Sequence, residues 1–211
     1  MAPPFGSWWG ALGLAIADHQ RDIMNIGSRL PYAIVALAAA VVVVVAWVTQ
    51  LPSPEPGSPA PSFTAYELEG GEASLEDYEG NVILLNIWAT WCPPCRYEMP
   101  SMQRLYDHFE DEPFEIVAVS VDSPPGEADA DGNPGGDVEA FVNELGLTFP
   151  ILHDPGQGIQ RTYQSPWLPE SFVIGMDGVI YRKVAGATEW DEPRYKELIQ
   201  RLLDEGRGEA Q

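Results

Sequence analysis

Two apolar segments near the middle of the chain are typical of buried strands. Residues 81–88 (NVILLNIW) and 115–121 (EIVAVSV) are nearly continuous in β-branched and aliphatic residues, as in strands covered on both faces. Between them, residues 96–110 place apolar side chains at helical spacing, and Pro100 is expected to kink that helix. The pattern therefore predicts strand, helix, strand over the first half of this region.

Further along the chain, shorter segments continue the alternation of predicted strands and helices. Met176-Asp177-Gly178 separates two β-rich stretches, and Asp-Gly is a strong hairpin signal. A mixed central sheet flanked by helices, an α/β sandwich, accounts for the whole order. The remaining predicted elements are helices at 137–145, 158–163 and 192–203, and extended segments at 148–152, 171–174 and 179–184.

Residues 30–51 form a different kind of segment, with no charged residue in it. As a helix it would be about 33 Å long, enough to cross a hydrocarbon core of roughly 30 Å. Arg21 and Arg29 precede it and the next basic residue is Arg96, so residues 1–29 are expected in the cytoplasm and the rest outside. The alternatives are a cleaved signal peptide and a translation start at Met24.

The predicted transmembrane anchor is followed by a linker and one domain. Residues 52–61 contain five prolines in ten positions, which favours an extended, semi-rigid spacer. The remaining residues, 62–211, are enough for one hydrophobic core.

Composition narrows the possible functions. The chain of 211 residues has 32 acidic and 11 basic residues, a net charge of −21, opposite to the basic surface that binds nucleic acid. Two cysteines are too few for a disulfide-framed mini-protein or a four-thiolate zinc module. Asp129, Asp131 and Asn133 are spaced like calcium ligands within the loop 123–136, but the rest of that motif is missing, which favours an acidic surface loop.

The two cysteines, Cys92 and Cys95, stand at C-x-x-C spacing between a predicted strand and the start of a helix. Free N–H groups and the helix dipole stabilise an anion there, which favours the thiolate of Cys92. Cys95, one turn further in, is expected to be more buried and to resolve a mixed disulfide. A zinc site would need two further ligands at a recognised spacing, which the sequence does not offer. Covalent haem attachment would need a histidine directly after Cys95. A purely structural disulfide would close a very short loop and contribute little stability.

These residues also carry a resemblance. WATWCPPCRYEMP (88–100) and LPESFVIGMDG (168–178) resemble the membrane-anchored TlpA/ResA-like thioredoxin family, and the similarity covers essentially all of 62–211. It implies a thioredoxin-like fold in which Pro169 is a cis-proline facing the cysteine pair and the Leu168 backbone binds an extended client. The residues that it and the motif indicate as client contacts are Trp91, Pro93, Pro94, Leu168 and Pro169.

Glu98 matches an acidic residue that family members carry near the active site. A buried carboxyl there would accept the proton of Cys95; the alternative is a solvated helix glutamate. Asn86 replaces the buried aspartate of ordinary thioredoxins, so their proton handling cannot be transferred. Trp167, where many relatives have a small residue, either shapes the client groove or caps the core.

The resemblance implies a membrane-anchored, extracytoplasmic protein-disulfide reductase. Its clients would be proteins with disulfides, such as an apocytochrome c, and a membrane thiol transporter would supply electrons. The redox-active disulfide Cys92–Cys95 would serve without any other cofactor or metal. A peroxiredoxin-like peroxidase is a second hypothesis, although Ala89 stands where the required threonine is expected and Thr90 follows it. A copper-binding assembly factor using the cysteines and His153 is a third.

Overall fold

The computed structural model describes residues 31–32, 34–43 and 54–209. The chain divides into two units, Met1–Leu51 and Pro52–Gln211. In the first, residues 31–32 and 34–43 are helical. Within the described residues, no helix is both long enough and apolar enough to cross a bilayer. The predicted cytoplasmic segment and much of the predicted anchor lie outside the described residues, so both stay predictions.

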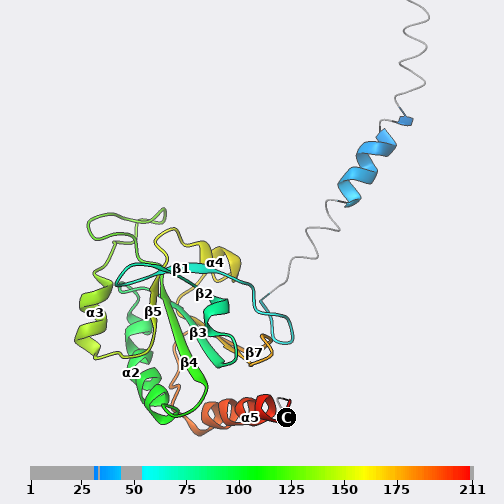
Figure 1. Cartoon of the computed structure of the whole chain (residues 1–211). Coiled ribbons are helices and arrows are strands. Elements are labelled where there is room, and N and C mark those ends of the chain that lie inside the picture. The colour runs from blue at the N-terminus through cyan, green and yellow to red at the C-terminus, as the bar shows by residue number, and fades with distance from the viewer. Residues whose placement is uncertain (1–30, 33, 44–53, 210–211) are drawn as a thin grey trace, which may run out of the picture. The chain divides into compact units, whose positions relative to one another are not determined.

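The second unit is built on one mixed sheet of seven strands (Figure 1). The buried strand β3 lies near its centre, parallel to β4 and antiparallel to β6. All seven residues of β3 are buried, as expected of a strand covered on both faces. The sheet order is β2-β1-β5-β4-β3-β6-β7, with β1 Thr64–Glu67, β2 Glu72–Ser74, β3 Val82–Trp88, β4 Phe114–Ser120, β5 Ile151–His153, β6 Glu170–Ile174 and β7 Ile180–Ala185.

Four α-helices and one short 3-10 helix accompany this sheet. They are η1 Leu75–Tyr78, α2 Pro93–His108, α3 Val138–Leu145, α4 Gly158–Thr162 and α5 Pro193–Glu209. The predicted mixed α/β arrangement is confirmed. The hairpin of β1 and β2 was not predicted, because most of its side chains are exposed and leave little apolar alternation to recognise. Helix α5 continues past residue 203 to 209.

The two faces of the sheet are covered by different elements. Successive residues of a strand point to opposite faces, so Asn86 and its β6 partner Ser171 share one face, while Leu85 and Phe172 share the other. Helix α2 contacts the first pair through Glu98, which bonds Asn86, and the loop before α5 reaches Glu98 through Trp190. Tyr163, just after α4, packs its ring on Phe172 at 4.8 Å between centroids. The polar pair is therefore enclosed between the sheet and α2.

The proline-rich linker differs from its prediction as a spacer. Its backbone pairs with the hairpin that leads into β7: the Gly57 N–H donates to the Ile180 carbonyl at 2.8 Å, and the Ile180 N–H donates to the Ser58 carbonyl at 2.9 Å. The Tyr163 hydroxyl donates to the Pro61 carbonyl at 2.7 Å. Described residues 54–61 therefore belong to the domain. The spacer prediction is wrong for them, because their free backbone groups find partners at the sheet edge.

The acidic loop 123–136 is held by its own side chains. Asp129 Oδ1 accepts the backbone N–H groups of Asp131 and Asn133, at 2.9 and 2.8 Å, and Asp129 Oδ2 accepts the Asn133 side-chain amide at 2.8 Å. In the described part of the chain, no three His, Cys, Asp or Glu residues lie close enough to hold a metal ion. Asp129 thus caps a turn of the loop, in place of the calcium-ligand role weighed from the sequence.

Candidate active site

The cysteine pair occupies the first turn of α2. Cys92 is the N-cap residue and forms a disulfide with Cys95. Pro93 and Pro94 occupy the next two positions and have no N–H to offer, so the N–H of Cys95 is the first one available from the helix. It points at Cys92 Sγ, with 3.2 Å between nitrogen and sulfur. The local sequence thus places one N–H donor, together with the positive end of the helix dipole, on the sulfur of Cys92.

The two sulfurs differ in accessibility. Cys92 is 4% exposed and Cys95 is completely buried, so the predicted order of burial is confirmed. Pro93 and Pro94 are exposed in front of the pair, and Trp91 is half-buried against the core. A partner sulfur can therefore approach from the side of Cys92 and the two prolines.

The segment before β6 lies level with the end of β3. Ile87 pairs with Glu170, so Pro169 comes next to the point where β3 leads into the cysteine turn. The Leu168–Pro169 peptide bond is cis, as the family resemblance implies. Pro169 is buried and Leu168 half-buried. Trp167 is 80% exposed, so it does not cap the core, and its role in a client groove stays a prediction.

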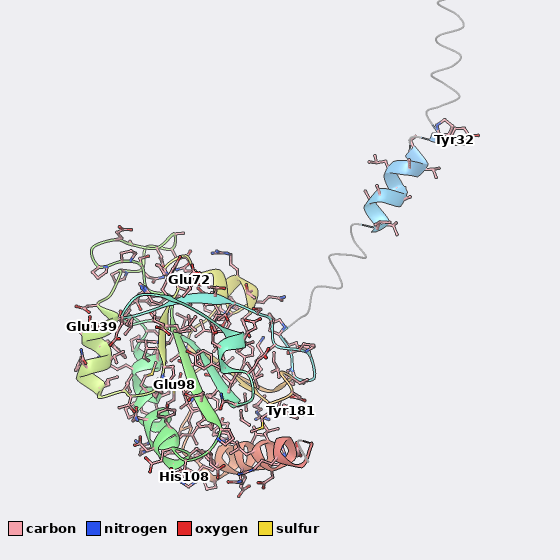
Figure 2. The ribbon with its side chains drawn as sticks, in the orientation of Figure 1. Tyr32, Glu72, Glu98, His108, Glu139 and Tyr181 are labelled. Carbon is pink, nitrogen blue, oxygen red and sulfur yellow. A yellow bond between two sulfur atoms is a disulfide. The ribbon has the colours of Figure 1, made fainter. Side chains whose placement is uncertain are left out.

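Glu98 lies inside the domain, where α2 meets the sheet (Figure 2). It is completely buried, so the solvated alternative is wrong. Its Oε1 accepts the Asn86 side-chain amide at 2.8 Å. Its Oε2 accepts two N–H groups, the Thr188 backbone at 3.3 Å and the Trp190 indole at 3.2 Å. Three donors from two distant segments therefore converge on one carboxyl group.

These surroundings act on the pKa of Glu98 in opposite directions. Burial penalises the charged form and raises the pKa, and the donors Asn86, Trp190 and Thr188 lower it. Burial is the larger effect, so the resulting pKa is raised to about 7. A carboxyl group with such a pKa is present in both forms at neutral pH. It can accept a proton and return it, and it lies one helical turn after Cys95.

Asn86 joins Glu98 to the strand that follows the cis-proline. Its side-chain nitrogen donates to Glu98 Oε1 and to Ser171 Oγ, both at 2.8 Å. Its buried Oδ1 has no hydrogen-bond partner. The amide thus connects β3, α2 and β6.

A second buried carboxylate fixes the chain just before Cys92. Asp122, at the end of β4, accepts the Thr90 N–H at 2.8 Å, the Thr90 hydroxyl at 2.5 Å and the Ser120 hydroxyl at 2.7 Å. His153 lies at the end of β5 with Nε2 2.7 Å from the Asp122 backbone oxygen. Asp122 was not identified from the sequence, because a lone aspartate after a strand carries no distinctive signal.

Thr188 and Trp190 were also missed. Trp190 is 92 residues from Glu98 along the chain, and a tryptophan in a predicted loop is ordinarily interpreted as part of the core. No spacing rule connects it to the cysteine motif. Only the return of the chain from β7 toward α5 brings its indole to Glu98.

Known proteins are similar to this chain in sequence. The family model described as AhpC/TSA matches residues 56–183. The thiol-disulfide oxidoreductase ResA of Bacillus thuringiensis strain Al Hakam is 40% identical over 130 residues, 62% of this chain and 69% of that protein. The protein of the same name from Geobacillus thermodenitrificans is 38% identical over 145 residues, 68% of this chain and 78% of its own length.

Solved structures agree on the fold. A Chlorobium tepidum protein described as thiol:disulfide interchange protein DsbE superposes with a TM-score of 0.60 at 27% identity, over 71% of this chain and 98% of that one. StoA from Bacillus subtilis superposes with a TM-score of 0.50 at 26% identity, over 66% of this chain and 95% of that one. The fold is thioredoxin-like, and the chain belongs to the AhpC/TSA family as a thiol-disulfide oxidoreductase similar to ResA.

Proposed function

We propose that the protein is a membrane-anchored, extracytoplasmic reductase of protein disulfides that works through Cys92 and Cys95. The observation that carries this proposal is the Cys95 N–H directed at Cys92 Sγ at the start of α2. A hydrogen bond to the sulfur stabilises the thiolate over the thiol and lowers its pKa. Cys92, the more exposed of the two, is therefore the nucleophile.

The first step forms a mixed disulfide. The Cys92 thiolate of the reduced protein attacks one sulfur of a client disulfide, and the client's S–S bond breaks as a new S–S bond forms. The second client sulfur leaves as a thiolate and takes a proton from solvent. Trp91, Pro93 and Pro94 are the proposed contacts on the side of the cysteines, and Leu168 and Pro169 on the side of β6, where an extended client strand pairs with the Leu168 backbone.

The second step releases the client. Cys95 loses its proton to Glu98, and its thiolate attacks Cys92 Sγ. The S–S bond between Cys92 and the client breaks as the Cys92–Cys95 disulfide forms, and the client's first sulfur leaves as a thiolate that takes a proton from solvent. Two electrons pass from the protein to the client. The pKa of Glu98, raised to about 7 by its burial, suits this transfer. Apart from the disulfide itself, the proposed cycle uses neither cofactor nor metal.

The setting is proposed from the sequence. The uncharged segment 30–51 and the arginines before it favour a single span with the domain outside the cytoplasm. In such a compartment thiols are oxidised by default, so a reductant needs a supply of electrons. A membrane thiol transporter is the proposed donor, and an apocytochrome c with an oxidised C-x-x-C-H motif is the proposed client.

Trapping tests the assigned roles. In cells that express the full chain, Cys95→Ser should accumulate mixed disulfides, visible on non-reducing gels and identifiable by mass spectrometry, because Cys92 can still attack but nothing resolves the adduct. Cys92→Ser is the matched control and should trap none. Adducts on Cys92→Ser alone would reverse the two roles, and cytochrome c peptides absent from the Cys95→Ser adducts would refute the proposed client.

The location needs a separate test. Alkaline carbonate extraction should leave the full chain in the membrane fraction. A protease added to intact protoplasts should degrade residues 54–209. Extraction into the supernatant would contradict the anchor, and protection from the protease would contradict the extracytoplasmic side.

Peroxidase activity is the second hypothesis for this family. The nearest threonine to the nucleophile, Thr90, has its hydroxyl hydrogen-bonded to Asp122, so the geometry favours thiol exchange. Consumption of hydrogen peroxide by the reduced full chain at a rate comparable to that of disulfide reduction would support the peroxidase instead.

A further inference from the structure

We propose that Trp190, with the backbone N–H of Thr188, is a positioning residue that holds Glu98 in its ionised form and directs the transferred proton to Oε1. Both donors lie on the loop between β7 and α5, a segment that no cysteine motif includes. The inference rests on the proposed role of Glu98 in thiol exchange and extends it to a residue outside the motif.

The argument starts from the chemistry of the donors. An indole N–H and a backbone N–H can only donate a hydrogen bond, so neither can accept one from a protonated carboxyl group. Both are directed at Oε2 of Glu98, at 3.2 and 3.3 Å. Together they use the two acceptor positions of that oxygen.

The position of the proton follows from this occupancy. A proton on Oε2 would displace one of its two buried N–H donors, and an unpaired buried donor is costly. Oε1 accepts only the amide of Asn86, so it keeps a free acceptor position. A proton at that free position of Oε1 leaves the Asn86 amide bond and both bonds from the loop in place. Glu98 is therefore protonated at Oε1, on the side of Asn86.

The loop between β7 and α5 is fixed in place by hydrogen bonds and by packing of the Trp190 ring. The Trp190 backbone N–H donates to Ser101 Oγ at 2.9 Å, and that hydroxyl lies 2.7 Å from the Glu98 carbonyl, to which it donates. The Trp190 side chain is completely buried and packs on the Tyr195 ring at 4.5 Å between centroids. The indole cannot turn to another acceptor without opening the core.

Few other groups near Glu98 can change its charge balance. Neither Asn86 from β3 nor Ser171 from β6 titrates. Glu189 and Asp191 flank Trp190 but both pair with Arg104 of α2, at 3.2 and 2.6 Å. The titratable or charged groups around the site are Cys92 at the N-cap of α2, Cys95, Tyr97 and Arg104 from α2, Glu189 and Asp191 from the loop, and Arg194 and Tyr195 from α5; Arg194 donates to the Thr188 hydroxyl at 3.3 Å. Besides the cysteines, the donors from the loop are thus the main adjustable influence.

The first experiment needs no substitution. In the full chain, solubilised in detergent and oxidised, the Trp190 indole proton and the Glu98 carboxyl carbon are followed by NMR as pH is raised from 4 to 9. The two signals should titrate together, because the indole bond strengthens when Oε2 gains charge. An indole signal that stays constant while the carboxyl carbon titrates would overturn the proposal.

The second experiment removes the donor. Trp190→Phe keeps an aromatic ring in the core but removes the indole N–H together with part of the ring, so the pKa of Glu98 should rise by about one unit, a tenfold change in proton affinity. Tyr195→Phe is the matched control: it removes a hydroxyl 3.2 Å from the Thr188 hydroxyl that does not touch Glu98, and it should leave this pKa unchanged. An unchanged or lowered pKa in Trp190→Phe would refute the inference, and if that variant does not fold, the titration of the unsubstituted chain decides.

The pH profile of disulfide reduction separates this inference from the proposed function. If the chain reduces disulfides, the profile of Trp190→Phe should move upward by about one pH unit with the pKa of Glu98. A chain without reductase activity whose indole still titrates with Glu98 would refute the function and leave the positioning intact. An active chain with an unshifted profile in Trp190→Phe would refute the positioning alone.

Discussion

Replacing Glu98 by glutamine should change how stability depends on pH. Burial raises the pKa of this carboxyl from 4.5 to about 7, so between these values the folded protein binds a proton more tightly than the unfolded chain does. Its contribution is therefore fully present below pH 4.5 and is lost as pH rises through 7. A shift of this size corresponds to about 3 kcal/mol. Relative to Glu98→Gln, the unsubstituted protein should lose about this much stability over that range.

The measurement uses residues 52–211, which form a separate compact unit. Guanidinium unfolding of the oxidised domain is followed by tryptophan fluorescence at several pH values between 4 and 8, since Trp88 and Trp190 are completely buried. The other acidic groups occur in both proteins, so the difference between the two curves isolates Glu98. A difference that stays constant to within about 1 kcal/mol, the order of the extrapolation error, would refute a buried carboxyl with a raised pKa.

Three further substitutions, one of them with a matched control, test the packing of the domain by the same unfolding assay. Asp122→Ala should cost about 3 kcal/mol or more, because it removes a buried carboxylate that accepts three hydrogen bonds; an unchanged midpoint would contradict this network. Gly136→Ala should lower the free energy of unfolding by about 1 to 3 kcal/mol, since a Cβ there would lie 1.8 Å from Thr90 Oγ1. In the control Gly208→Ala, the new Cβ meets nothing within 4 Å, so the free energy of unfolding should stay within about 0.5 kcal/mol. Equal effects of the two substitutions would refute the close approach at Gly136. Tyr163→Phe should cost about 1 kcal/mol through its bond to the linker carbonyl, and no loss would show that the linker is not held there.

The chemistry of the cysteine pair could be predicted from local sequence. A strand buried on both faces is recognisable from its continuous apolar residues, and the start of a helix from the prolines that follow Cys92. Position at a helix start then dictates which sulfur is stabilised. The structure places Cys92 at the N-cap with the Cys95 N–H on its sulfur, because every part of this arrangement lies within a few residues.

The linker shows where local reasoning fails. Five prolines indicate an extended backbone, and the backbone of residues 57–60 is indeed available for pairing. Whether such a segment remains in solvent depends on a free strand edge, and the neighbourhood of β7 provides one. The sequence of the linker contains no information about that edge, which lies more than a hundred residues away.

The surroundings of Glu98 illustrate the same division. The sequence by itself determined that an acidic residue follows Cys95 by one turn, and it left burial and exposure as equal alternatives. Tertiary structure decided between them by closing β3 and the loop before α5 over the carboxyl group. A pKa depends on what surrounds a group in space, and the Trp190 and Thr188 donors come from the far end of the chain. The order of the residues thus specified the proposed nucleophile, and only the packing of distant segments specified the proposed proton acceptor.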